Sequence, residues 1–210
     1  PGVFCLLPSR LHRTGPKVGQ RISVTIQTAT LGRTGLEVSR LGVGLVQLGH
    51  LSLDEAARAG HNLGAPLDAG VNFPDTAECY RNSEALIGKT VAHRHSEFVL
   101  ATKAGHAVDE DFRRVPSENW TAETVRDSID RSLVRLKTDC VDLFQLHADD
   151  ISAPPPDDVL QAVMDAKDTG KTRFLGYSGE NEDAEWAVQS GLFDTLQTAF
   201  NLVNQRRLRS

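Results

Sequence analysis

The strongest constraint on the fold is a regular alternation between short apolar runs and amphipathic segments. Six runs that read as strands lie at 40–46, 71–76, 97–103, 140–147, 172–178 and 194–201. Strands separated by helical segments predict parallel βαβ units, because a parallel connection needs a crossover of a dozen or more residues. The runs are apolar almost throughout, as expected for strands that are covered on both faces.

The segments between these runs have the features of helices. We expect helices at 52–70, 83–93, 121–137, 157–170 and 181–191. In the third of them, Val125, Ile129, Leu133 and Leu136 recur at helical spacing and would form one apolar stripe.

The chain of 210 residues can bury one substantial core. Residues 28–39 contain two β-prone stretches around a glycine turn and predict a hairpin. Residues 1–27 show no clear period and are expected to form a leader, so that the folded domain spans 28–210.

Two architectures fit this alternation: an open, doubly wound sheet and a (β/α)8 barrel. A doubly wound dinucleotide-binding fold usually carries GxGxxG between its first strand and helix, and "GVGLVQLG" has only two close glycines. The barrel is therefore favoured. It needs eight βα units and typically ~250 residues, so we expect about six of the eight units here.

Two prolines conflict with the expected elements. Pro74 removes a hydrogen-bond donor inside what would be a central strand. Pro66, together with Gly64, is expected to interrupt the first helix.

Charge and cysteine content exclude several classes of function. The net charge of −5 argues against a nucleic-acid or membrane-surface partner. No apolar run approaches the ~20 residues that span a bilayer. Cys5, Cys79 and Cys140 are odd in number and lack CxxC spacing, so neither a disulfide framework nor a structural zinc site is indicated. We therefore expect no metal and a cytoplasmic location.

Polar residues end four successive predicted strands. The ends carry Asp75, Lys103, His147 and Ser178, and Tyr80 follows five residues after Asp75. In a barrel the carboxyl ends of the strands form one rim, which is where the chemistry takes place. Each residue alone has a plainer interpretation as a turn cap, a solvated charge or a packed side chain; "DTAE" from Asp75, for example, matches a capping box.

Together, four of these residues form a set that can transfer a proton. A phenol such as Tyr80 titrates near pH ~10, and an adjacent ammonium such as Lys103 favours its ionised form. The Asp75 carboxylate would keep that ammonium charged, and the His147 imidazole could polarise a substrate oxygen. Nothing in the set can supply a hydride, so a reduction would need a cofactor.

At these positions the chain resembles the aldo-keto reductases. "LGRTGLEVSRLGVG" is similar to their opening hairpin and first strand, and "NFPDTAECYRNSEALIGK" to the segment with their Asp and Tyr. "FVLATKAG" and "VDLFQLH" resemble the segments with their Lys and His, while "GKTRFLGYS" and "LQTAFNL" resemble the fifth and sixth strands. The resemblance implies a catalytic tetrad of Asp75, Tyr80, Lys103 and His147, with NADPH as hydride donor and an aldehyde or ketone as substrate.

The resemblance also implies cofactor contacts. Ser178 and Gln197 match the residues that hold the nicotinamide carboxamide, and Asp75 lies beside them. An Asn that usually follows the Ser is replaced by Gly179, and Gly44 and Leu45 could offer backbone contacts only. In the family, the last two βα units carry the aromatic that stacks on the nicotinamide and the basic segment that grips the 2′-phosphate.

Three functions are open at this point. The leading one is NADPH-dependent reduction of a carbonyl to an alcohol with Tyr80 as general acid. The second is a truncated, non-catalytic subunit that binds partners, which the absence of two βα units would favour. The third is a barrel lyase that uses Lys103 as a Schiff-base nucleophile.

Overall fold

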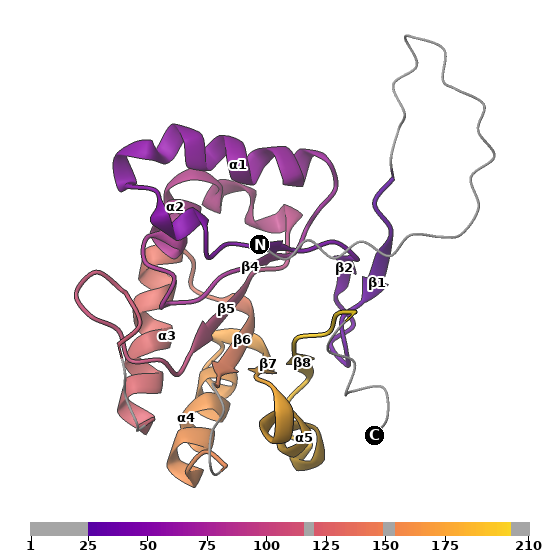
Figure 1. Ribbon diagram of the computed structural model, residues 1–210, viewed down its shortest axis with the longest axis vertical. Helices are drawn as coiled ribbons and strands as arrows, with labels where there is room; N and C mark the ends of the chain where they lie inside the picture. Colours follow the sequence, from indigo (N-terminus) through magenta and orange to yellow (C-terminus); the bar gives the residue numbers. More distant parts are fainter. Residues whose placement is uncertain (1–24, 116–119, 149–153, 203–210) are drawn as a thin grey trace, which may run out of the picture.

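The computed structural model describes residues 25–115, 120–148 and 154–202 (Figure 1). It opens with an antiparallel hairpin of β1 (Thr28–Thr30) and β2 (Glu37–Ser39). The hairpin is confirmed. The predicted leader lies outside the described residues apart from 25–27, and so do residues 203–210 of the predicted domain.

A six-stranded parallel sheet follows the hairpin. Its strands are β3 (Val43–Gly44), β4 (Pro74–Asp75), β5 (Ala101–Ala104), β6 (Val141–His147), β7 (Thr172–Ser178) and β8 (Thr195–Gln197). The α-helices are α1 (Ala56–Asp68), α2 (Ser83–Thr90), α3 (Ala122–Leu136), α4 (Asp157–Asp168) and α5 (Asn181–Ser190). Three 3-10 helices, Leu48–His50, Leu53–Glu55 and Ala92–Glu97, complete the elements. Each predicted strand and helix therefore has a counterpart.

The strand order identifies the architecture. The strands run β3-β4-β5-β6-β7-β8, in chain order and all parallel. A doubly wound sheet reverses its order partway, so that alternative is wrong. Gln197 Nε2 on β8 donates to Asp75 Oδ2 on β4 at 3.0 Å. Across a flat sheet these two strands would be about 19 Å apart, at about 4.8 Å per neighbour. The sheet is therefore curled into part of a barrel.

The helices cover the outer, convex side of this curled sheet (Figure 1). Each of α1, α2 and α3 contacts the next helix along the chain. The predicted stripe on α3 faces the sheet: Val125, Ile129 and Leu136 are buried and Leu133 is partly buried in the same cluster. The longest described helix, α3, has 15 residues, and within the described part no helix is long and apolar enough to cross a membrane.

Both unexpected prolines are accommodated at the ends of their elements. Pro74 is the first residue of β4, a position where proline is tolerated. The neighbouring sheet hydrogen bonds do not need an N–H at residue 74. Val43 N–H donates to the Phe73 carbonyl at 2.9 Å, and Thr76 N–H donates to the Ala101 carbonyl at 2.9 Å. The expectation that Pro66 interrupts the first helix is wrong, because α1 continues to Asp68 with Pro66 in its last turn.

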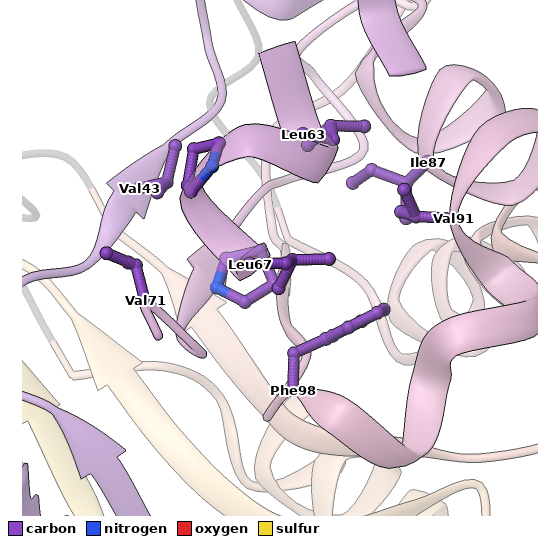
Figure 2. Close-up of a pocket in the computed structure, with 9 residues that line it drawn as sticks. Val43, Leu63, Leu67, Val71, Ile87, Val91 and Phe98 are labelled. Carbon is purple, nitrogen blue, oxygen red and sulfur yellow. The ribbon is translucent and has the colours of Figure 1, made fainter. Parts of the chain in front are cut away.

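The two proline rings share an apolar environment. They line a small cavity between α1, α2 and the beginning of the sheet, together with Val43, Leu63, Leu67, Val71, Ile87, Val91 and Phe98 (Figure 2). Its volume is about 10 Å³, close to the minimum for one water molecule. A space of this size and lining is a packing gap rather than a ligand site.

Candidate active site

A buried ion pair lies at the centre of the site. The Lys103 side chain on β5 is 1% exposed, and its Nζ lies 2.7 Å from Asp75 Oδ1 at the end of β4. Lys103 Nζ also donates to the Thr76 carbonyl at 2.9 Å. On its other side, Asp75 accepts from Gln197 Nε2 at 3.0 Å and from Gln145 Nε2 at 3.4 Å. The Asp75 carboxylate thus joins side chains from β5, β6 and β8.

The phenol and the imidazole flank this ion pair. Lys103 Nζ lies 5.0 Å from the centre of the Tyr80 ring. The Tyr80 and His147 rings meet edge to face, with 6.2 Å between their centres. The structure therefore brings the four residues of the predicted tetrad together, although they come from β4, its following loop, β5 and β6.

The loop that carries Tyr80 is fastened to helix α3. Glu78 is 2% exposed and accepts from Ser128 Oγ at 2.5 Å and from Arg131 Nε at 2.6 Å. Arg135 donates to the Glu78 carbonyl at 3.3 Å and to the Arg81 carbonyl. Glu78 is thus used for anchoring the loop before Tyr80 and not for a capping box with Asp75, while Arg135 holds the backbone on both sides of Tyr80.

The pKa values of the ring side chains follow from burial. Burial raises the pKa of Tyr80 above its ordinary value of 10.0, while the nearby Lys103 ammonium acts in the opposite direction. The expected effect of Lys103, which favours the ionised phenol, is therefore present, but desolvation of the phenolate is larger. Burial, with the positive charges of His106 and Lys103, lowers the pKa of His147 to about 2, so this imidazole is neutral at physiological pH.

The predicted cofactor residues lie around the same rim. Gly44 is paired with Asp75, and a Cβ atom added at Gly44 would meet nothing within 4 Å. Ser178 is in register with His147 on one side and with Gln197 on the other. Leu45 is engaged within the protein: its N–H donates to the Asp75 carbonyl at 2.9 Å and its carbonyl accepts from Leu48 N–H at 3.1 Å. A cofactor contact from the Leu45 backbone would have to replace one of these bonds.

Steric crowding explains why residue 179 is a glycine and not the expected Asn. A Cβ atom at Gly179 would lie 2.7 Å from Cε1 of Tyr177, whose ring is fully buried. Tyr177 in turn packs against Trp186 and Phe193, with ring centres 5.8 Å and 5.2 Å away. No side chain therefore fits at residue 179 unless this aromatic cluster moves.

Three residues of the site were missed by the sequence analysis. Gln145 lies on β6 within reach of Asp75, and it donates to Gln197 Oε1 at 2.9 Å. His106 stacks on His147 with 4.0 Å between ring centres, and Cys79 lies against both imidazoles. His106 follows the β5 strand end by only a few residues, so extending the strand-end rule into the loops would have found it.

The comparisons with known proteins agree on one family. Residues 40–209 match the model of the aldo/keto reductase family. The chain is 36% identical to the 6-dehydroglucose reductase of Novosphingobium aromaticivorans over 182 residues, 80% of this chain and 56% of that protein. It is 35% identical to the L-galactose dehydrogenase of Arabidopsis thaliana over 167 residues, 73% of this chain and 49% of that protein.

A solved structure supports the same relationship. The holo form of the aldo-keto reductase AKR11C1 from Bacillus halodurans superposes with a TM-score of 0.71 and 26% identity, covering 83% of this chain and 58% of that one. The chain spans about half the length of the curated relatives that it matches.

Proposed function

Because the chain belongs to the aldo/keto reductase family, we propose that it forms the catalytic part of an oxidoreductase that uses NADPH to reduce an aldehyde or ketone to an alcohol. The observation that carries the proposal is the buried Asp75–Lys103 ion pair beneath Tyr80 and beside His147. A buried charge pair against a phenol at a barrel rim is the kind of arrangement that active sites use to direct proton transfer.

The residues present fit the nicotinamide end of the cofactor. Ser178 and Gln197 offer a hydroxyl and an amide on neighbouring strand ends, and Gly44 leaves open space beside Asp75. Bound nicotinamide would supply the hydride. Gln197 already bonds to Asp75 and to Gln145, so its amide is held in place rather than free to rotate.

The side chains of the chain itself would manage the proton. Tyr80 donates its hydroxyl proton to the substrate oxygen as negative charge develops there. Lys103 stabilises the resulting phenolate, and Asp75 keeps the ammonium oriented. The neutral His147 ring donates a hydrogen bond to the same substrate oxygen and adds no positive charge of its own.

The geometry disfavours the lyase alternative. A Schiff base requires a free amine that can attack a carbonyl. Lys103 Nζ instead lies in a closed environment, between the Asp75 carboxylate at 2.7 Å and the Thr76 carbonyl at 2.9 Å. A non-catalytic subunit remains the alternative, and an assay of NADPH oxidation distinguishes it from a reductase.

The decisive experiment compares two tyrosine variants. NADPH oxidation is followed with a panel of aldehydes, ketones and sugar-derived carbonyl compounds, the last because two relatives are named for sugar reactions. Tyr80→Phe should lower kcat by at least about 10²-fold, the usual contribution of a general acid. Tyr177→Phe is the matched control, since that hydroxyl is buried without a hydrogen-bond partner among the described residues.

Two outcomes would contradict the proposal. If Tyr80→Phe and Tyr177→Phe both keep kcat within a few-fold of the parent protein, Tyr80 is not the acid. If the parent protein turns over none of the panel although NADPH binds, the non-catalytic alternative is favoured.

The cytoplasmic location stays a prediction.

A further inference from the structure

Three potential metal ligands converge beside the proposed catalytic residues. Cys79 Sγ lies 3.4 Å from His106 Nδ1 and 3.8 Å from His147 Nδ1. The ligand atoms of the three residues all lie within 4.8 Å of one another. From this geometry we propose that Cys79, His106 and His147 form a binding site for a zinc-like divalent transition-metal ion.

The spacing matches what zinc requires. Zinc binds cysteine sulfur at about 2.3 Å and histidine nitrogen at about 2.0–2.1 Å, so tetrahedral geometry places sulfur and nitrogen ligands about 3.6 Å apart. The two observed sulfur–nitrogen distances, 3.4 Å and 3.8 Å, lie on either side of that value. The two sulfur–nitrogen separations therefore suit one zinc-sized ion.

The backbone holds the three ligands in place. Cys79 follows Glu78, which is fastened to α3, and His147 ends β6. His106 follows Gly105, whose φ of +136° is a conformation that glycine adopts readily, and a Cβ atom there would lie 2.6 Å from the His147 carbonyl oxygen. Glycine thus allows the loop after β5 to pass close enough for the two imidazoles to stack.

The chemistry of the site selects among metals. One sulfur and two imidazole nitrogens suit zinc and its neighbours, whereas Mg²⁺ and Ca²⁺ prefer oxygen ligands. The positive charges of Lys103 and Arg114 act on both histidines and oppose any ion held by charge alone. All three ligand residues are half-buried, and a tetrahedral ion with these three protein ligands would take its fourth ligand from solvent.

The test measures metal binding directly and does not depend on reductase activity. Metal-free protein is titrated with Zn²⁺ by calorimetry and with Co²⁺ by absorption, where a thiolate ligand gives a charge-transfer band. We expect one ion per chain, a higher melting temperature with Zn²⁺, and no response to Mg²⁺. Cys79→Ser and His106→Asn should each weaken Zn²⁺ binding by at least about 10- to 100-fold. Mutating a residue that only supports a metal ligand already lowers metal affinity by about that much.

Cys140→Ser is the matched control, because Cys140 is a free cysteine that lies outside the cluster. It should keep both the Zn²⁺ affinity and the cobalt–thiolate band. The proposal is overturned if the parent protein binds no Zn²⁺, or if Cys79→Ser and His106→Asn, shown to be folded by circular dichroism, bind it as the parent does. Failure of the reductase assay would leave each of these readings unchanged.

Discussion

At the scale of single residues, the proposed chemistry depends on a charge that has been removed from water. The Lys103 ammonium is almost completely buried and contacts one carboxylate and one carbonyl oxygen. Removing one member of a buried pair leaves the other uncompensated, which costs more than the pair contributes when intact. Asp75 and Lys103 should therefore behave as one unit.

We expect Lys103→Met and Asp75→Asn to lower kcat individually, and the double variant to be little worse than the poorer single one. The interaction energy from such a double-mutant cycle should be about 0.5–3 kcal/mol, because the residues are in direct contact. Thermal unfolding of all four proteins separates loss of chemistry from loss of structure. Strictly additive losses of activity would show that the ion pair does not act on Tyr80 as a unit.

Sequence reasoning located the residues of this site better than it described their state. Asp75, Lys103 and His147 were found because parallel strands present their carboxyl ends at one rim. The effect of Lys103 on the Tyr80 pKa was predicted, but the larger, opposing effect of burial was not, because burial of a loop residue is not visible in the spacing of motifs. Cys79 was considered only as part of a disulfide or CxxC pattern. Its contacts with His106 and His147 could not be predicted, because the three residues lie on three separate segments of the chain.

At the scale of elements, the strands are joined by buried polar contacts as well as by backbone hydrogen bonds. Asp142 on β6 accepts from Leu100 N–H at 2.8 Å and from Arg173 Nη1 on β7 at 2.6 Å, and His95 Nε2 lies 3.5 Å away. Burial alone would raise the pKa of Asp142, but the hydrogen bonds from these three groups lower it below the ordinary value of 3.8.

Asp142→Asn should therefore destabilise the protein in a pH-dependent way. A depressed pKa contributes stability that is complete above pH 3.8 and is lost as pH falls through the lower, folded-state value. We expect a loss of about 1–3 kcal/mol at pH 7 and a smaller difference near pH ~3. Urea unfolding at both pH values measures this difference in the free energy of unfolding. Asp168→Asn is the control, because Asp168 is exposed. An equal loss at both pH values would contradict the assignment.

Element boundaries were less predictable than element types. The strand and helix patterns gave all six parallel strands and five helices, yet β4 is only two residues long and begins at Pro74. Proline rules also overstated the effect of Pro66, because α1 continues past it to Asp68 although Pro66 has no N–H for the carbonyl four residues earlier. Tertiary packing, here around the apolar gap beneath α1, decides where such elements end.

At the scale of the whole molecule, the curled sheet presents two edges. Within the described residues, β3 and β8 each pair with one other strand of the sheet. Unpaired edges favour association with other strands. The alternation of apolar runs and helices predicted parallel βαβ units, and the missing GxGxxG then favoured the barrel. The curl of the sheet is visible only in contacts such as Asp75–Gln197.

We expect a polypeptide of these 210 residues to bind NADPH weakly. The assigned residues Gly44, Ser178 and Gln197 reach the nicotinamide end, and no described residue is assigned to the adenosine phosphate. Charge-assisted hydrogen bonds contribute ~1.5–3 kcal/mol each, so lacking two of them would raise Kd by about 10²- to 10⁴-fold. A chimera extended by two βα units of a full-length relative should bind more tightly when NADPH fluorescence is titrated. Micromolar binding by the 210-residue polypeptide would instead place the phosphate site within it.

The sequential strand order also bears on how the sheet can assemble during folding. Each strand from β3 to β7 pairs with the strand that follows it in the chain, so the sheet can grow from β3 onward while the polypeptide is still being synthesised. The bond between Asp75 and Gln197 joins residues 122 positions apart, and the entropy of closing so long a loop is recovered only after the intervening units have assembled. The carboxylate beside Lys103 therefore acquires its full set of partners last, and a chain arrested before β8 would contain Asp75, Tyr80, Lys103 and His147 without a completed site.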